Sequence, residues 1–171
     1  MTNNLSIITS ARARRGGAHA LRPQARIALV PTQFNDSYAV ASARSAAILT
    51  RILEDRGIAD VRAATEEQWG SALRAGGIRE DAGTRSAVMA LMDVHRGAHG
   101  LPAVGSREQR IDYNTVRKAA RLASVLIEAG TTPTDANDEQ WGLACAIIGT
   151  TRPASVATRE AAQTLTFWKA L

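Results

Sequence analysis

The sequence predicts an all-α protein in which two tandem three-helix repeats form one helical bundle, preceded by an extended basic N-terminal arm. The first observation is a hexapeptide, Glu-Gln-Trp-Gly-Ser-Ala at residues 67–72, that returns as Glu-Gln-Trp-Gly-Leu-Ala at residues 139–144. The second is that apolar residues around both copies recur three and four positions apart, as on one face of an α-helix. The third is a run of arginines near the N-terminus without any acidic residue.

The internal repeat keeps nearly the same separation along its length. Trp69 and Trp141 lie 72 residues apart, and Arg85 and Arg159 lie 74 residues apart. Repetition at a fixed separation is a strong architectural signal, because each unit covers the apolar face of its neighbour. The chain is therefore expected to comprise an arm, a first helical repeat, a linker and a second helical repeat, at residues 1–35, 36–96, 97–106 and 107–171.

The first repeat is expected to contain three helices. Gly57 suits the C-terminal cap of the first helix. Thr65 opens the second helix three residues before Gln68, a spacing typical of a capping box, and this helix stops near residues 76–77. The apolar residues at helical spacing in the first and third helices are Val40, Ala43, Ala47, Leu49, Ile52, Leu53, Val88, Leu91 and Met92.

The second repeat follows the same order, after a linker that is rich in helix-breaking residues. Asn137 opens its second helix three residues before Gln140, which is again the spacing of a capping box, and Gly149 marks the end of this helix. The apolar residues expected to face the core from its third helix are Ala161, Leu165 and Trp168.

Trp69 and Trp141 are the largest residues of the two hexapeptides, and two roles are open for them. A tryptophan buries about 150–250 Å² and dominates a small core, so each is expected to anchor its three-helix unit. A base-stacking role in nucleic-acid binding needs an exposed ring instead. The burial of the two rings separates these interpretations.

The excess positive charge of the chain is concentrated in its arm. The whole chain has 21 Lys and Arg, 16 Asp and Glu, and a formal net charge of +5. The arm holds five cations and no acid, so the remaining residues carry equal numbers of both signs. A basic arm interrupted by glycines commonly neutralises phosphates irrespective of base sequence, and a solvated tail is the other interpretation. The arginines expected to contact phosphates are Arg12, Arg14, Arg15, Arg22 and Arg26.

A second cluster of cations opens the second repeat. Arg110, Arg117 and Arg121 are separated by seven and four residues, so they fall near one face of the expected helix, beside Lys118. This face is a second candidate phosphate-binding surface. The alternative is an ordinary solvated face whose cations pair with nearby acids. The acids available for this pairing are Glu108, Asp112 and Glu128.

No catalytic constellation can be assembled from the chemically active residues. His19 lies in the arm, and His95 and His99 flank the linker without the partner ligands of a zinc site. Cys145 is the only cysteine and stands in an apolar helix, as a buried structural thiol does. The sequence therefore predicts a protein that is not an enzyme and that needs neither a cofactor nor a metal.

Two functions fit these features. The first is a structural protein that packages DNA or RNA in a sequence-tolerant way and associates with copies of itself, with arginines and backbone amides holding the phosphates. In architecture this is similar to the coat and nucleoprotein subunits of filamentous and rod-shaped viruses, which join helical bundles to extended arms. The alternative is a transcriptional regulator with tandem helix-turn-helix units, in which Arg85 and Arg159 enter the major groove of DNA.

The expected location follows from the absence of two sequence signals. The chain has no run of about 18 apolar residues, and its first residues lack the charged-then-apolar order of a secretory signal. A membrane is therefore not an expected partner. The protein is expected in the cytoplasm, or within a nucleoprotein particle or virion.

Overall fold

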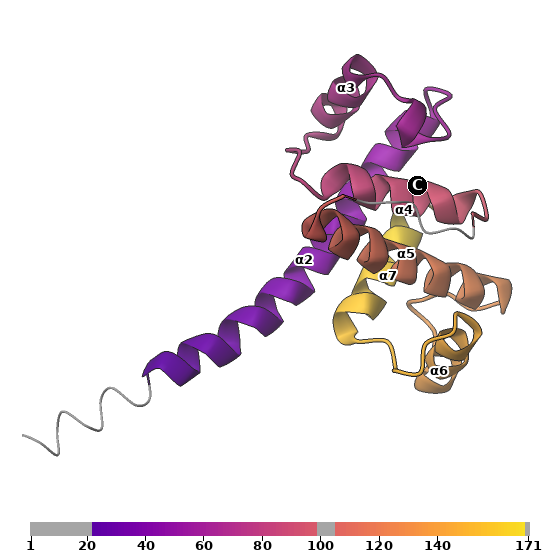
Figure 1. The fold of residues 1–171 in the computed structure, drawn as a ribbon. Coiled ribbons are helices and arrows are strands. Elements are labelled where there is room, and N and C mark those ends of the chain that lie inside the picture. The colour runs from indigo at the N-terminus through magenta and orange to yellow at the C-terminus, as the bar shows by residue number, and fades with distance from the viewer. Residues whose placement is uncertain (1–21, 99–104, 170–171) are drawn as a thin grey trace, which may run out of the picture. The chain divides into compact units, whose positions relative to one another are not determined.

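The computed structural model describes residues 22–98 and 105–169, with side chains described for residues 38–98 and 105–166. Within these residues the backbone forms α-helices, one short 3-10 helix and no strand (Figure 1). The predicted all-α class is therefore confirmed. The elements are α2 (Arg22–Glu54), η1 (Val61–Ala63), α3 (Glu66–Gly76), α4 (Thr84–His95), α5 (Arg107–Glu128), α6 (Asp138–Ile147) and α7 (Val156–Lys169).

The helix α2 begins well before the first helix that the sequence predicts. The chain divides into two units, residues 1–35 and residues 36–171, and α2 belongs to both. The extended conformation predicted for residues 22–35 is therefore wrong. Pro31 removes one hydrogen bond inside α2, whereas Pro23 at the start of this helix costs no such bond. The rest of the predicted arm, residues 1–21, lies outside the described residues.

Both helices that carry the repeated tryptophan begin with the predicted capping box. In α3, Thr65 Oγ1 accepts a hydrogen bond from the Gln68 amide, and Gln68 Oε1 accepts one from the Thr65 amide. In α6, Asn137 and Gln140 exchange the same two bonds, each 2.9 Å long. These reciprocal bonds satisfy amides that the helix itself leaves without partners. Each helix therefore starts at a residue fixed by its local sequence.

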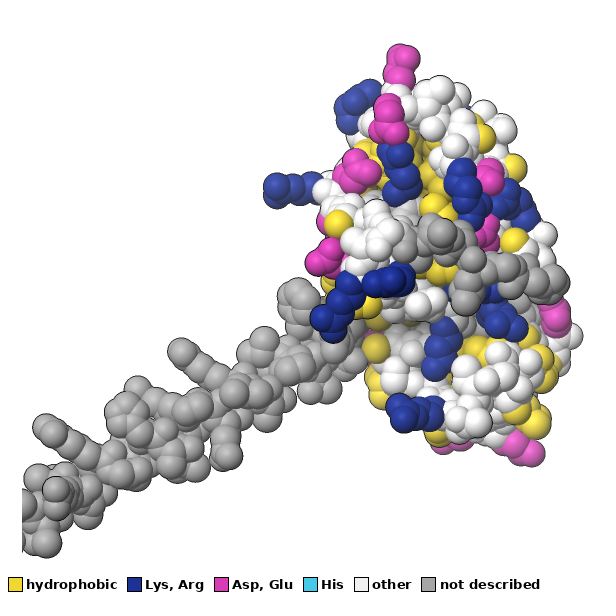
Figure 2. All heavy atoms as spheres, in the orientation of Figure 1, with side chains coloured by type: hydrophobic (Ala, Val, Ile, Leu, Met, Phe, Trp, Pro, Cys, Tyr) yellow, Lys and Arg dark blue, Asp and Glu magenta, His cyan; other side chains and the backbone are white. Residues whose placement is uncertain are grey.

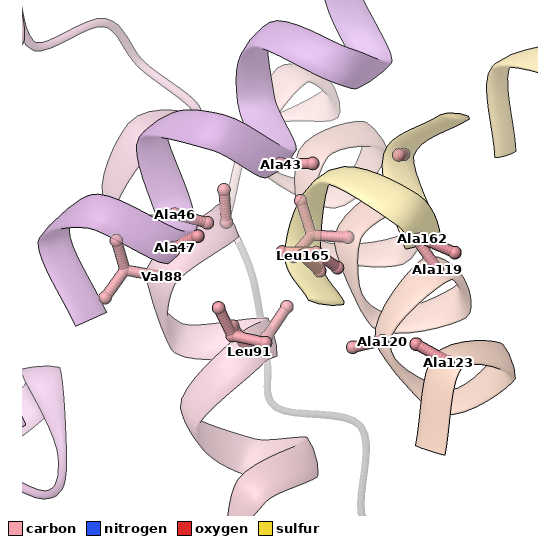
Figure 3. Packing of buried hydrophobic residues seen from close by; sticks show 14 of the residues in the cluster. Ala43, Ala46, Ala47, Val88, Leu91, Ala119, Ala120, Ala123, Ala162 and Leu165 are labelled. Atoms are coloured by element: carbon pink, nitrogen blue, oxygen red, sulfur yellow. The ribbon is translucent and has the colours of Figure 1, made fainter. Parts of the chain in front are cut away.

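One hydrophobic cluster joins the described elements between residues 36 and 169. It contains buried residues from η1 and from each helix from α2 to α7, and α5 packs against α4, α6 and α7 within it. Short alanine side chains pave the facing helix surfaces, so the helices approach one another closely (Figure 3). The buried alanines of α2, α4, α5 and α7 are Ala39, Ala43, Ala46, Ala47, Ala87, Ala90, Ala119, Ala120, Ala123, Ala157, Ala161 and Ala162.

The two repeated tryptophans are core residues. Trp69 is 1% exposed and Trp141 is 2% exposed, which confirms their predicted role as anchors and excludes base stacking by either ring in this conformation. The Trp69 indole nitrogen donates a 2.7 Å hydrogen bond to Glu80. A buried indole commonly finds such a partner, because its N–H is costly to leave without one.

Most of the other residues predicted for the core are also buried. The exceptions are Val40 and Ile52, which are only partly covered, and Trp168, whose side chain lies outside the described part. The buried members of the predicted set are Ala43, Ala47, Leu49, Leu53, Val88, Leu91, Met92, Ala161 and Leu165. Among the described helices, none combines the length and the apolar character that crossing a membrane requires.

Candidate nucleic-acid interface

The helix α5 carries the second cluster of cations, and its start is fixed by a third capping box. Ser106 Oγ accepts a hydrogen bond of 3.1 Å from the Gln109 amide, and Gln109 Oε1 accepts one of 2.9 Å from the Ser106 amide. The inward side of α5 is buried against its neighbours. The buried residues on that side are Asp112, Tyr113, Val116, Ala119, Ala120, Leu122, Ala123 and Leu126. This burial fixes which side of α5 faces the bundle and which side faces solvent.

The outward side of α5 is basic. We define the α5 basic face as Arg107, Arg110, Arg117, Lys118 and Arg121. Arg107, Arg110 and Arg121 are exposed, and Arg117 and Lys118 are half-buried. With a rise of 1.5 Å per residue, the face extends roughly 21 Å along the helix. In Figure 2, Lys and Arg side chains are spread over the molecular face that is shown, and Asp and Glu side chains lie among them in its upper half.

Three cations of the α5 basic face have no acidic partner among the described residues. Arg110, Lys118 and Arg121 take part in none of the ion pairs that join described residues. Asp112 is 1% exposed and its carboxylate is turned into the bundle, where it accepts hydrogen bonds from Tyr38 at 2.7 Å and Ser42 at 2.8 Å. The α5 basic face therefore keeps its positive charge toward solvent.

Arg117 differs from the other members of the α5 basic face. Its guanidinium lies 6.0 Å from the centroid of the Tyr113 ring, which is a long cation–π distance. Tyr113 is itself buried and donates a 2.9 Å hydrogen bond to Asp93. Arg117 is thus partly committed to the protein, and Arg110, Lys118 and Arg121 are the cations best placed to bind an anion.

The buried Asp112 carboxylate holds α5 against α2 and the start of α4. Tyr38 and Ser42 reach it from α2, and a Cβ atom at Gly83, the residue that precedes α4, would fall within the carboxylate itself. Only glycine leaves the space that this approach needs. Burial raises the pKa of Asp112 above its ordinary value, although the two hydroxyl donors act in the opposite direction.

A second buried carboxylate, Asp93, joins α4 to η1 and α5. Arg62 binds it through both terminal nitrogens, at 2.9 and 2.8 Å, and Arg96 binds it at 2.6 Å. Burial alone raises the pKa of Asp93, but the hydrogen bonds from Arg62, Tyr113 and Arg96 outweigh it, so the pKa lies below the ordinary value. Burial and the bond to Asp93 raise the pKa of Tyr113 to about 12.

The two arginines that a helix-turn-helix protein would direct to DNA are held by their own units. Arg85 binds both oxygens of Glu66, at 2.7 and 2.8 Å, and its guanidinium lies 4.9 Å from the Trp69 ring centroid. Arg159 makes the equivalent contacts, with a bond of 2.6 Å to Asp138 and a distance of 5.4 Å to the Trp141 ring centroid.

This acid–arginine–tryptophan arrangement was not anticipated from the sequence, although a signal for it is present. Glu66 and Asp138 are separated by the same 72 residues as the two tryptophans, and an arginine follows each tryptophan at nearly equal distance. Equal separations of three mutually compatible residue types indicate a contact that occurs twice. Such stacking of a guanidinium on an indole is favourable in itself.

The predicted arginines of the arm are only partly within the described residues. Arg12, Arg14 and Arg15 lie outside them. Arg22 and Arg26 lie in the first turns of α2, and their side chains are not among those described. The structure therefore places the predicted site residues of α5 on one helix face. The phosphate contacts expected of the arginines in the arm stay a prediction.

Cys145 and His95 occupy ordinary structural positions. Cys145 is buried in α6, as predicted. His95 Nδ1 lies 3.1 Å from a Glu54 oxygen, and His19 and His99 lie outside the described residues. Within the described ranges, no three His, Cys, Asp or Glu side chains are grouped so that they could hold a metal ion.

No protein-family model matches this sequence, and no curated protein or solved structure matches the chain. The function is therefore inferred from the charge, exposure and contacts of the residues themselves.

Proposed function

We propose that this protein is a non-enzymatic nucleic-acid-binding protein that packages DNA or RNA as a self-associating, coat- or nucleoprotein-like subunit. The observation that carries this proposal is the α5 basic face, which presents Arg110, Lys118 and Arg121 to solvent without any ion-pair partner among the described residues. A row of unpaired cations on a rigid helix attracts a phosphate backbone.

The character of this face favours sequence-tolerant binding. Phosphate contacts position a protein on a nucleic acid, and base contacts specify the sequence. The buried rings of Trp69 and Trp141 do not stack on bases, and Arg85 and Arg159 are engaged by acids. The features that remain on the surface of α5 are charges, which bind phosphates of any sequence. The arginines of the arm would extend the same sequence-tolerant contact.

The proposal predicts a salt-dependent loss of binding when the α5 basic face is neutralised. The test variant carries Arg110→Gln, Lys118→Gln and Arg121→Gln, and binding to labelled single-stranded RNA and duplex DNA is followed by fluorescence anisotropy over a range of salt concentrations. We plot the logarithm of the association constant against the logarithm of the salt concentration. The magnitude of its negative slope should decrease by about 3 on duplex DNA and by about 2 on single strands, equally for unrelated base sequences.

A matched control separates this effect from the loss of net charge. Arg74, Arg79 and Arg152 are exposed cations outside α5, and their change to Gln removes the same charge. The control should keep nearly the wild-type slope. Equal losses in both variants would show that only overall charge matters, and an unchanged slope in the α5 variant would refute the proposed interface.

Support for self-association comes from the outer surface of α6. Leu143 is 60% exposed and Ile147 is 67% exposed, and both lie beside the small residues Gly142 and Ala146. We call these four residues the α6 apolar face. The equivalent helix of the first repeat has Ser71 and Ala75 at the positions of Leu143 and Ile147, so the second copy is more apolar where it meets solvent. A helix surface of this kind is typical of a protein interface.

Replacing the two exposed apolar residues of α6 with the residues at the equivalent positions of α3 should weaken self-association. The variant Leu143→Ser with Ile147→Ala is examined by sedimentation velocity over a range of protein concentrations, with and without nucleic acid. We expect the concentration needed for association to rise about tenfold or more, because two exposed apolar contacts are lost. The control Ile111→Ser changes an apolar residue of α5 that is 45% exposed. Association that is equally weak in the control, or unchanged in the variant, would contradict a role for α6.

A further inference from the structure

A cavity of about 120 Å³ that is partly open to solvent lies between α2, α4 and α7. Its apolar walls come from three helices, with Ala47 from α2, Leu91 from α4 and Leu165 from α7 (Figure 3). A smaller cavity of about 30 Å³ shares Leu91 and Leu165 with it. A volume of about 30 Å³ is the share of a single water in the liquid, whereas a dry cavity of about 150 Å³ holds benzene. The larger cavity therefore has room for a small organic molecule.

One polar group in this cavity has no partner. Thr50 lines the cavity and is 1% exposed, and its Oγ1 atom makes no hydrogen bond within the protein. Nearly all buried polar groups in proteins have a hydrogen-bond partner, because a buried hydroxyl without one is unfavourable. A threonine in a helix can also bond the carbonyl of the preceding turn, but this one does not. The hydroxyl is thus available to a molecule inside the cavity.

The charged residues at the cavity are already paired. Arg51 binds Asp55 through its Nε atom at 3.0 Å, and His95 lies 3.1 Å from Glu54. Arg51 is thus paired with an acid, and the Glu54 carboxylate has a polar partner in His95, so neither charged group of the cavity lining stands alone. The chemistry of the lining therefore favours a neutral molecule with an apolar body and one hydrogen-bonding group.

We propose that this cavity is a binding site for a small neutral aliphatic molecule of about five non-hydrogen atoms that carries one hydroxyl or carbonyl group. The polar group bonds Thr50 Oγ1, and the aliphatic part packs against Ala47, Leu91 and Leu165. The ligand contacts α2 and α4 on one side and α7 on the other. It therefore stabilises the arrangement of these helices, since a ligand that binds only the folded state raises its stability.

The test compares a polar and an apolar probe of equal size. The full-length protein is titrated with 1-butanol and, separately, with cyclopentane, and the methyl resonances of Ala47, Leu91 and Leu165 are followed by NMR. In the wild type, 1-butanol should shift these resonances in a saturable way. In Thr50→Val, which keeps the side-chain shape, the affinity for 1-butanol should fall about tenfold, and the affinity for cyclopentane should stay equal or rise.

A second variant tests the position of the site. Ala47→Leu places extra methyl groups in the cavity and should abolish the saturable shifts for both probes. Unshifted cavity methyls in the wild type would mean that the cavity holds only water, and the proposal would be overturned. An affinity for 1-butanol that is equal in the wild type and in Thr50→Val would overturn it as well, because the threonine hydroxyl would then have no role.

Discussion

Changing Gly83 to alanine should destabilise the protein by about 4 kcal/mol, the largest effect expected from any single methyl group. The added Cβ atom would occupy the position of the Asp112 carboxylate. Asp112 would have to move away, and its hydrogen bonds with Tyr38 and Ser42 would be lost within the bundle. Urea denaturation should show a lower midpoint, and the slope of the free energy of unfolding against urea concentration should be unchanged. The melting temperature should fall by on the order of 10 °C.

Two comparisons isolate the cause of this loss. Gly142 lies inside α6, where an added Cβ atom meets nothing within 4 Å, so Gly142→Ala should be neutral or stabilising by up to about 1 kcal/mol. In a background of Asp112→Ala, the obstacle at Gly83 is absent, and Gly83→Ala should cost much less. An equal cost in both backgrounds would show that the collision with Asp112 is not the reason for the glycine.

Replacement of Asp93 by asparagine should cost about 2 to 3 kcal/mol. The asparagine keeps the shape of the side chain but removes the negative charge that Arg62, Arg96 and Tyr113 share. The Asp93 side chain is 4% exposed, so solvent cannot replace the lost interaction. As a control, Asp55→Asn breaks an exposed pair with Arg51 and should change the free energy of unfolding by less than about 1 kcal/mol.

The contribution of Asp93 should depend on pH with a definite sign. Its pKa is lower in the folded protein than in the unfolded chain, so the folded state favours the charged form. The stabilisation is then fully present above the unfolded pKa of about 3.9 and is lost as the pH falls through the lower folded value. Denaturation of the wild type and Asp93→Asn should therefore converge in acid. A difference that stays constant from neutral to acid pH would contradict the buried ion pairs as its origin.

Features set by neighbouring residues were within reach of sequence analysis. The capping boxes at Thr65 and Asn137 depend on partners only three residues away, and the outward direction of Arg110 and Arg121 depends on helical spacing alone. The tryptophans of the repeated hexapeptides are core residues because burial of an indole is so favourable. These parts of the fold needed no knowledge of how the helices pack.

Contacts between distant segments could not be predicted in this way. The sequence offers Asp112 as a partner for neighbouring arginines, but it lies two residues from Arg110 and therefore on nearly the opposite side of α5. Its true partners, Tyr38 and Ser42, are 74 and 70 residues away. The lack of ion pairs between Arg110, Lys118 or Arg121 and the described acids is likewise a property of the packed bundle, since it depends on where those acids lie.

The capping box at Ser106 has a consequence for how α5 meets a ligand. Because the helix is closed at its first turn by its own side chains and anchored along its inner side, its cations are preorganised before any polyanion arrives. In the proposed function, association with a polyanion would then immobilise side-chain ends only, without the conformational entropy cost of folding a segment at the moment of contact. On this capped helix, the binding free energies of several weak phosphate contacts would not be offset by a cost of ordering the backbone.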